Sequence, residues 1–183
     1  MRTNQKINVN ENILLKQINV SDAKDIFNLI DSQRSYLRKW LPFIDGTKQI
    51  KDTEDYIYTV EKETLNNKEL VFVIFYKNKL AGTIGMKRAD WVTRTTEIGY
   101  WLSEDFQKKG IITQSVKALM RFAFDELKLN TVIIKCGVGN LPSKNIPMRL
   151  KFNFIGIEKK TELSSDGEYI DLEVYSFSKK INS

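Results

Sequence analysis

The sequence lacks histidine altogether and contains a single cysteine, Cys136. Without an imidazole side chain, zinc hydrolase chemistry on histidine ligands and Ser-His-Asp catalysis are both excluded. A lone cysteine cannot form an internal disulfide, which suits a reducing cytoplasm, and it offers no cysteine-rich metal site. Proton transfer must therefore rest on carboxylates, tyrosine, serine, lysine, cysteine or water, and no metal site is predicted.

Long apolar runs are also missing. No stretch approaches the roughly 18 to 20 residues that would span a bilayer, and the N-terminal MRTNQKINVNEN has no apolar core of signal-peptide length. We therefore expect a soluble cytoplasmic protein with no membrane role. No segment is rich enough in proline, glycine or serine to be a linker, and there is no internal repeat. A chain of 183 residues can bury a proper core, so we predict one domain over residues 1–183.

Charge is moderately basic, with 29 Lys and Arg residues against 23 Asp and Glu residues and a net charge of +6. Such a balance fits nucleic acid, an acidic protein partner or an anionic cofactor, and it selects none of them. The basic residues are scattered without a run of five, which is typical of a solvated surface. No direct nucleic-acid role is expected.

Hydrophobic periodicity predicts strands and helices along the whole chain. Strands are expected at Ile13–Ile18, Val71–Tyr76, Leu80–Met86, Thr93–Leu102, Thr131–Val138, Phe152–Lys160 and Glu168–Phe177. Helices are expected after a Ser21 N-cap and over Asp52–Leu65, Gly110–Leu129 and Pro142–Lys151. An antiparallel meander that feeds a βαβ crossover predicts an α/β fold, a mixed α+β arrangement, with about seven strands and helices on both faces of the sheet.

The segment Glu97–Ile112, EIGYWLSEDFQKKGII, carries the most information about function. A predicted strand runs into a turn that contains Gly110, and the turn opens the clearest helix of the chain. The free N–H groups of a first helical turn and the positive end of the helix dipole bind phosphate groups well. The segment therefore predicts a phosphorylated ligand.

Four motifs in this order resemble those of the GNAT superfamily of acyl-CoA-dependent N-acetyltransferases. They are EIGYWL at Glu97–Leu102, Q-x-x-G at Gln107–Gly110, NLPSKNIPMRLKF at Asn140–Phe152 and IDLEVYSF at Ile170–Phe177. Within the superfamily the chain is similar to the RimJ/RimL group, which acetylates protein N-termini, including those of ribosomal proteins. The resemblance implies the GNAT fold, with a splayed pair of parallel strands in a mostly antiparallel sheet, and acetyl-CoA as cosubstrate without a metal.

The resemblance also implies where coenzyme A lies. In the superfamily the turn reads Q/R-x-x-G-x-G/A and its backbone amides hold the pyrophosphate. Gln107 and Gly110 match this pattern, whereas Ile112 replaces a small residue. A β-bulge at the end of the preceding strand brings backbone groups to the acyl carbonyl and the pantetheine arm. The cofactor contacts implied are Trp101, Leu102, Gln107, Lys108, Lys109, Gly110, Ile111, Ile112, Thr113, Asn140 and Ser143. For the two lysines, plain solvation is the alternative.

Glu97 is a carboxylate in the middle of an apolar and aromatic strand. The superfamily places a candidate general base at this position. If the side chain faces the cleft, partial burial would favour its neutral form and suit it to accept a proton from an ammonium substrate. The alternative is that Glu97 only pairs with a nearby lysine or arginine on the sheet.

Asn140 and Ser143 match the N-x-x-S element of the family. The resemblance implies that Asn140 hydrogen-bonds the cofactor and that Ser143 donates to the departing thiolate; a helix cap is the alternative interpretation. Many members carry a tyrosine acid where this chain has Pro147. Lys151 replaces a glycine at a helix end, and holding the left-handed conformation there would cost it about 1 kcal/mol.

The remaining aromatic and sulfur groups are expected to be structural. Trp40 and Trp91 are predicted to pack in the core or in loops, and Cys136 to be a small buried hydrophobe. The resemblance implies acetyl transfer to a primary amine and favours the N-terminal α-amino group of a protein, including a ribosomal one. Small amines or polyamines as acceptors, a CoA-binding module without catalysis and a basic RNA-binding protein are the alternatives. A homodimer is expected only by analogy.

Overall fold

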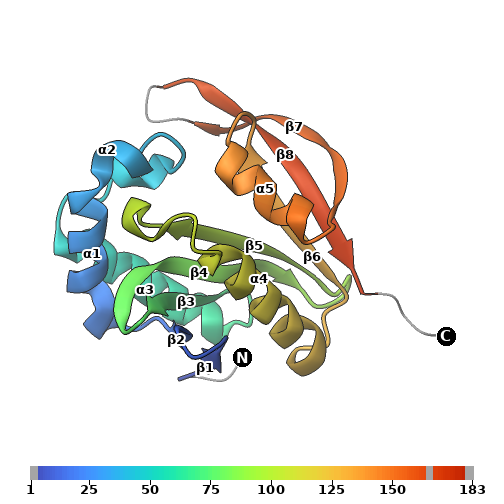
Figure 1. Cartoon of the computed structure of the whole chain (residues 1–183), viewed down its shortest axis with the longest axis horizontal. Helices are drawn as coiled ribbons and strands as arrows, with labels where there is room; N and C mark the ends of the chain where they lie inside the picture. Colours follow the sequence, from blue (N-terminus) through green and yellow to red (C-terminus); the bar gives the residue numbers. More distant parts are fainter. Residues whose placement is uncertain (1–3, 164–166, 180–183) are drawn as a thin grey trace.

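The computed structural model describes residues 4–163 and 167–179, and its centre is an eight-stranded mixed sheet (Figure 1). The strands follow the order β1-β2-β3-β4-β5-β6-β8-β7. They are β1 Lys6–Asn8, β2 Ile13–Gln17, β3 Leu70–Tyr76, β4 Lys79–Asp90, β5 Thr95–Leu102, β6 Thr131–Gly137, β7 Asn153–Leu163 and β8 Tyr169–Ser178. The helices are α1 Ala23–Ser32, α2 Arg34–Leu37, α3 Ile50–Leu65, α4 Ile111–Arg121 and α5 Leu141–Arg149.

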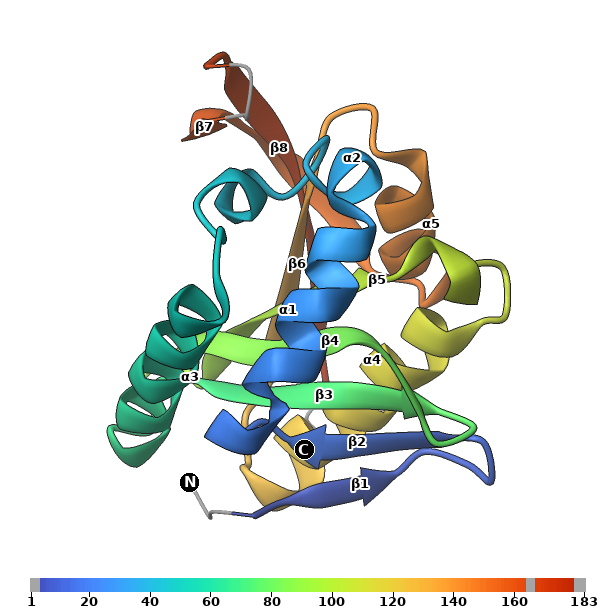
Figure 2. The ribbon, with the colours of Figure 1, turned by 90° about the vertical axis from the view of Figure 1, so that its left-hand side faces the viewer.

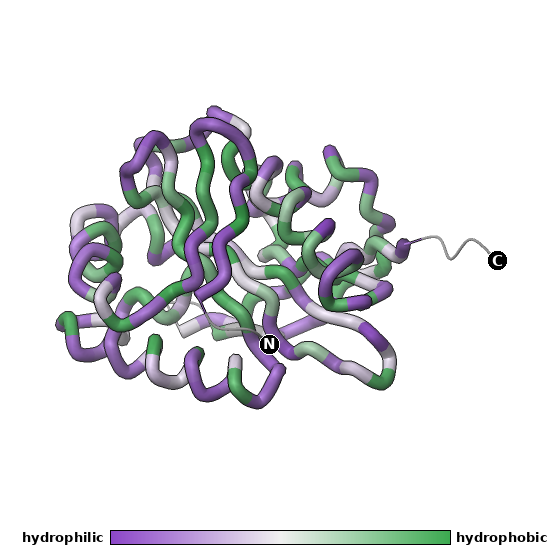
Figure 3. Tube along the Cα trace, turned by 90° about the horizontal axis from the view of Figure 1, so that it is seen from below, coloured by the Kyte–Doolittle hydropathy of each residue, from purple (hydrophilic) through white to green (hydrophobic). Residues whose placement is uncertain are grey.

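Helices cover both faces of the sheet, as the sequence predicts. Figure 2 shows α1 and α3 on one face, with α4 and α5 on the other. Each face has its own apolar cluster: Phe72 and Leu119 belong to the cluster on the α4 side, and Ile57 and Val73 to the cluster on the α3 side. The strand β3 contributes to both clusters because its continuous apolar run is buried on both faces. Along the trace, hydrophobic residues concentrate in the central strands, and hydrophilic residues recur along the surrounding helices (Figure 3).

A single parallel pair interrupts the otherwise antiparallel sheet and opens it. β5 pairs with β6 only from Thr95 to Glu97, opposite Thr131 to Ile133. Beyond these residues β5 continues to Leu102 beside β4, and β6 pairs only with β8. The two strands therefore diverge, and Glu97 is the last residue of β5 before the gap. The splayed pair expected from the family resemblance is confirmed.

The predicted β-bulge at the end of β5 is wrong. Pairing between β4 and β5 stays regular through Trp101 and Leu102, and the register shift lies at the other end, between Lys87 and Asp90. Arg88 has a φ of 54° at that shift, so the irregularity is absorbed there. The gap beside Trp101 therefore comes from the divergence of β6 and not from a bulge.

The elements differ from the sequence prediction in several places, including these three. The sheet has an eighth strand, β1, which is only three residues long and has no apolar run to reveal it. Asn19 rather than Ser21 is the cap, and it begins a 3₁₀ turn at Val20–Asp22 that precedes α1. The long helix predicted after Gly110 is α-helical only to Arg121 and then continues as a π-helical turn to Glu126.

Two further features bear on the sequence expectations. Lys151 has a φ of 60°, so it does hold the left-handed conformation where the family pattern has glycine. Lys151 follows the end of α5 and takes the left-handed conformation that ends many helices. Unlike a glycine, it does so with a side chain that disfavours this conformation. Within residues 4–163 and 167–179, no helix is long and apolar enough to cross a membrane.

Candidate active site

Two cavities of about 440 Å³ each adjoin at the gap between β5 and β6. One, here called the turn cavity, lies over the β5–α4 turn, and the other, called the sheet cavity, lies over the α1 and α3 face of the sheet. Six residues line both and mark where they meet: Trp40, Leu41, Tyr100, Trp101, Asn140 and Ser143. A ligand in the turn cavity can therefore reach a second ligand in the sheet cavity.

The turn cavity has backbone amides at its end. Gly110, with a φ of 71°, is the N-terminal residue before α4, and Gln107, Lys108 and Ile111–Thr113 line the same wall. The amide of Gln114 makes the first helical bond, 3.1 Å to the Gly110 carbonyl oxygen. The amides of Ile111–Thr113 precede it and have no partner within the helix, so they suit phosphate oxygens. The left-handed backbone conformation of Gly110 positions this row of free amides.

Ile112, the residue that departs from the family pattern, does not obstruct this cavity. Its side chain is 8% exposed and belongs to the apolar cluster between α4 and the sheet. The residue still lines the cavity, because its backbone lies in the first turn of α4. The large side chain therefore adds to the core, and the amide stays at the phosphate-binding wall.

The two lysines of the turn have different places. Lys108 lines the turn cavity, whereas Lys109 does not. The ammonium group of Lys109 donates to the carbonyl oxygen of Asp105 and lies 5.2 Å from the centre of the Phe106 ring. Lys109 therefore contacts the turn itself, and its expected contact with the cofactor stays a prediction.

Two residues from distant elements complete the turn cavity, and the sequence did not reveal them. Tyr36 of α2 accepts a hydrogen bond from the side-chain amide of Gln107, and burial raises the pKa of its hydroxyl. Arg149 of α5 donates to the hydroxyl of Thr113 at 2.9 Å. Both line the cavity. Arg149 thus supplies a cation beside the first turn of α4.

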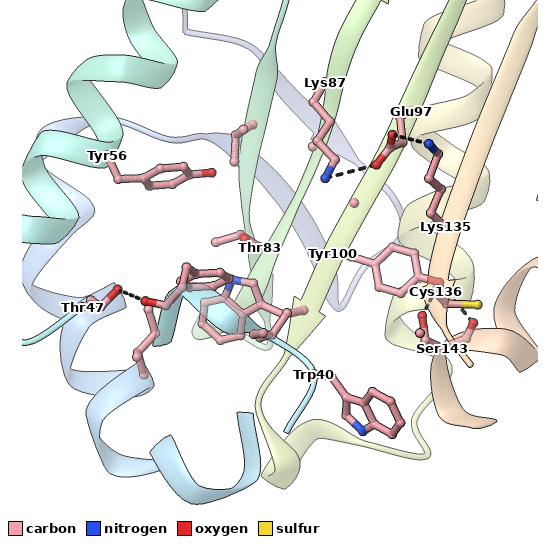
Figure 4. A pocket seen from close by; sticks show the side chains of 18 of the residues that line it. Trp40, Thr47, Tyr56, Thr83, Lys87, Glu97, Tyr100, Lys135, Cys136 and Ser143 are labelled. Atoms are coloured by element: carbon pink, nitrogen blue, oxygen red, sulfur yellow. Dashed lines mark hydrogen bonds and ion pairs between the residues drawn. The ribbon is translucent and has the colours of Figure 1, made fainter. Parts of the chain in front are cut away.

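The junction of the cavities holds a pair of hydroxyl groups (Figure 4). The hydroxyl of Tyr100 donates to the backbone carbonyl of Ser143 at 3.2 Å, and Ser143 Oγ lies 3.3 Å from the same hydroxyl. Burial raises the pKa of Tyr100, so its hydroxyl stays protonated. Asn140 accepts from the Ser143 amide at 3.2 Å, which confirms the helix cap. Where many family members carry a tyrosine in this helix, α5 has Pro147. The tyrosine that lies beside Ser143 is Tyr100 of β5.

At the end of β5, the backbone N–H groups of Trp101 and Leu102, both expected to contact the cofactor, point in opposite directions. The amide of Ser103 donates to the carbonyl of Ala81 in β4 at 2.8 Å. In an antiparallel pair the bonded direction alternates residue by residue. The N–H of Trp101 therefore points to β4, and the N–H of Leu102 points into the gap. Leu102 offers a backbone donor, and Trp101 offers its side chain to both cavities.

Glu97 lines the sheet cavity at the base of the gap and is 8% exposed. Its carboxylate lies 3.1 Å from Lys87 Nζ, 3.1 Å from Arg88 Nη1 and 4.0 Å from Lys135 Nζ. The expected pairing with a lysine and an arginine is confirmed, and because the side chain also lines a cavity, its role as a base stays a prediction. These cations compensate the negative charge that burial would otherwise disfavour.

Among the groups expected to be structural, Trp40 and Cys136 both line a cavity, and Trp40 departs further from the expectation. It lines both cavities, so it is part of the site and not simply packing. The indole of Trp91 lies outside them and donates to the Asn67 carbonyl at 2.8 Å. Cys136 is 4% exposed, and burial raises its pKa to about 11. A neutral, buried thiol is a poor nucleophile, as predicted.

The far wall of the sheet cavity combines aromatic and acidic side chains. Phe43 lies in the turn before α3, Asp52 and Tyr56 lie on α3, and Glu69 lies directly before β3. Of the described residues of the last hairpin, only Leu172 contributes. This wall is thus built mainly from α1, α3 and the chain between them.

Comparisons with known proteins agree with this geometry. The model of a protein family described as "Acetyltransferase (GNAT) domain" matches residues 12–153. A putative ribosomal N-acetyltransferase, YdaF, from Bacillus subtilis (strain 168) is 34% identical over 174 residues, which cover 94% of each chain. The ribosomal-protein-serine acetyltransferase of Escherichia coli (strain K12) is 29% identical, over 94% of this chain and 96% of the relative.

A solved structure shows the same fold. The ribosomal L7/L12 α-N-protein acetyltransferase RimL, in complex with coenzyme A, superposes with a TM-score of 0.91. It is 25% identical in sequence, and the match covers 95% of this chain and 98% of that one. The chain therefore belongs to the GNAT family of N-acetyltransferases.

Proposed function

We propose that this protein transfers the acetyl group of acetyl-CoA to the N-terminal α-amino group of a protein, including a ribosomal one. The observation that carries the proposal is the meeting of two cavities at Tyr100 and Ser143. One cavity ends in the free amides of α4, and the other contains Glu97. The names of the relatives, two of which refer to ribosomal proteins, support this class of acceptor. A cytoplasmic location, a single domain and a homodimer stay predictions.

The residues present can perform direct transfer. The pyrophosphate lies at the amides of Ile111–Thr113 beside Lys108 and Arg149, and the pantetheine arm lies in the gap where β5 and β6 diverge. Glu97 accepts a proton from the acceptor ammonium, and the free amine attacks the thioester carbon. The N–H of Leu102 stabilises the oxyanion as it forms. The C–S bond then breaks, and the proton that the attacking nitrogen loses as it becomes an amide passes by way of Ser143 to the departing thiolate.

The decisive experiment measures free-thiol release from acetyl-CoA against a panel of acceptors. The panel contains peptides with a free N-terminus, the same peptides with a blocked N-terminus, and small amines and polyamines. We expect release with the free peptides and none with the blocked ones, and mass spectrometry should place the acetyl group on the α-amine. Turnover only with small amines would mean that the acceptor is a small amine and not a protein N-terminus. Acetyl-CoA binding without any turnover, or salt-dependent RNA binding without CoA affinity, would overturn the proposal.

Ser143→Ala is expected to lower kcat by about tenfold, because the departing thiolate loses one hydrogen-bond donor. KM for acetyl-CoA should change much less, since the helix cap at Asn140 uses the backbone amide of residue 143 and not the hydroxyl. Steady-state kinetics with a peptide acceptor provide the measurement.

Ser115→Ala in α4 is the matched control. Ser115 Oγ is buried and has no hydrogen-bond partner in the described part of the chain, so its loss should leave kcat unchanged. Equal kcat in the wild type and in Ser143→Ala would exclude the serine from protonation of the thiolate.

A further inference from the structure

Carboxylates and lysines alternate across the strands that form the floor of the sheet cavity. The β3–β4 register begins with Leu70 opposite Met86, so Glu69, the residue before β3, comes beside Lys87, whose charge acts on its carboxylate; the β4–β5 register places Lys87 opposite Glu97. On the far side of the gap, Lys135 of β6 makes two hydrogen bonds to Glu158 of β7, at 2.8 and 2.7 Å. Lys87 therefore lies between two carboxylates, one directly before β3 and one in β5, and neighbouring strands of a sheet are about 4.8 Å apart.

Lys87 lies across the cavity floor and not out in solvent. Its Nζ is 3.1 Å from Glu97 Oε1, and the two ends of this pair are drawn together in Figure 4. The end of the lysine passes over Gly99, where an added Cβ would come 3.3 Å from Cε and 3.6 Å from Nζ. The absence of a side chain at Gly99 leaves room for this path. An ammonium group thus already occupies the cavity side of the candidate base.

Glu69 is the carboxylate on the other side of Lys87. It is half-buried in the cavity wall, and burial raises its pKa, while the positive charge of Lys87 opposes that rise. Among residues 4–163 and 167–179, no hydrogen bond or ion pair reaches its side-chain oxygens. A carboxylate that is partly desolvated and without a partner is costly, so a second position for a nearby ammonium is available here.

We propose that Lys87 holds the place of the acceptor ammonium, and that it moves from Glu97 to Glu69 when the acceptor binds. This inference rests on the proposed function, because it concerns how the same base receives its substrate. The acceptor ammonium takes the place of Lys87 at Glu97, and the displaced Lys87 pairs with Glu69. The charge of the cavity floor then stays balanced before and after binding.

The other two cations at Glu97 cannot take this part. Arg88 is 72% exposed at its side chain and does not line the sheet cavity. Lys135 is 18% exposed at its side chain and is held by Glu158. Only Lys87 combines a place in the cavity, a contact with Glu97 and an unpaired carboxylate as its next neighbour. Glu69 is therefore a positioning residue that acts through Lys87.

The test is a double-mutant cycle on the KM for a peptide acceptor. Glu69→Gln should raise this KM by about fivefold, the size of one partly exposed ion pair, because Lys87 loses its second position. The KM for acetyl-CoA should not change. In the Lys87→Gln background, the same Glu69→Gln change should have no effect on the acceptor KM, because no lysine needs to move.

Arg88→Gln provides the matched control background, since it also removes a cation 3.1 Å from Glu97 but lies outside the cavity. There the fivefold effect of Glu69→Gln should persist. An unchanged acceptor KM in Glu69→Gln alone would overturn the exchange, and so would an effect that persists without Lys87, which would mean that Glu69 attracts the acceptor directly. An enzyme inactive toward every amine would instead contradict the proposed function itself.

Discussion

Glu97→Gln is expected to lower kcat/KM for acetyl transfer by about a hundredfold to a thousandfold, because an amide of the same shape cannot accept the proton of the acceptor ammonium. The carboxylate is well placed for this role, since it is the last residue of β5 before the gap and faces the sheet cavity. Rates measured across a range of pH are the test. Because a free amine needs no base, the deficit should shrink at high pH, where more of the acceptor is deprotonated.

A matched control separates catalysis from charge balance. Glu173 in β8 is also 8% exposed, and its carboxylate lies 2.8 Å from Lys144 Nζ. The hydrogen bond from Lys144 and that from the Tyr175 hydroxyl lower the pKa of Glu173. Glu173→Gln should therefore reduce the free energy of unfolding as Glu97→Gln does, but with little effect on transfer. If the Glu97 variant retained full activity at every pH, the base would have to be another group.

The fold could be predicted from the sequence because its strongest signals are local. The continuous apolar run of β3 and the apolar stripe of α4 are each readable from a few neighbouring residues. The short β1 was missed because it pairs only at the sheet edge and has no apolar run. Likewise, no sequence pattern marks the change from α-helix to π-helical turn after Arg121, or the register shift beside Arg88.

The site was predictable where its residues are close together in the chain. Gln107, Gly110 and Ile111–Thr113 form one turn and one helix start, so a single motif describes them. Tyr36 and Arg149 line the same cavity from elements far away in sequence, and only the fold brings them there. Their types, a tyrosine and an arginine, are common on any surface, so no pattern indicates them.

Pairs of charges need the register as well as the fold. Lys87 and Glu97 are ten positions apart, and the β4–β5 pairing sets them opposite one another. Glu69 precedes β3 and comes beside Lys87 because β3 begins with Leu70 opposite Met86, and a slip of one residue in either strand would place its side chain on the other face. The sequence left open whether Glu97 would be a base or an ion-pair partner. The structure shows the ion pair, and because the paired carboxylate also lines a cavity, the base stays a prediction that the pair does not exclude.

Gly110→Val is expected to raise the KM for acetyl-CoA by about tenfold, because a β-branched residue disfavours the left-handed conformation by about 1 to 2 kcal/mol. Gly110 has a φ of 71°, and a Cβ there would meet only Gln114 Nε2 at 3.5 Å, so the cost arises from the backbone and not from a clash. Relaxing that strain must rotate the amides that follow. They would then no longer converge on a pyrophosphate, whereas the sheet cavity would keep its shape.

The measurement is the KM for acetyl-CoA and for a peptide acceptor in the same preparation, together with the free energy of unfolding. Gly167→Val is the control, since Gly167 has a φ of 83° in the β7–β8 connection and no atom of the described residues lies within 4 Å of an added Cβ. It places a similar backbone strain away from the turn and should leave both KM values unchanged. Equal losses for both substrates in Gly110→Val would mean that the turn supports the whole site. A selective loss for acetyl-CoA is what a phosphate-binding row of amides requires.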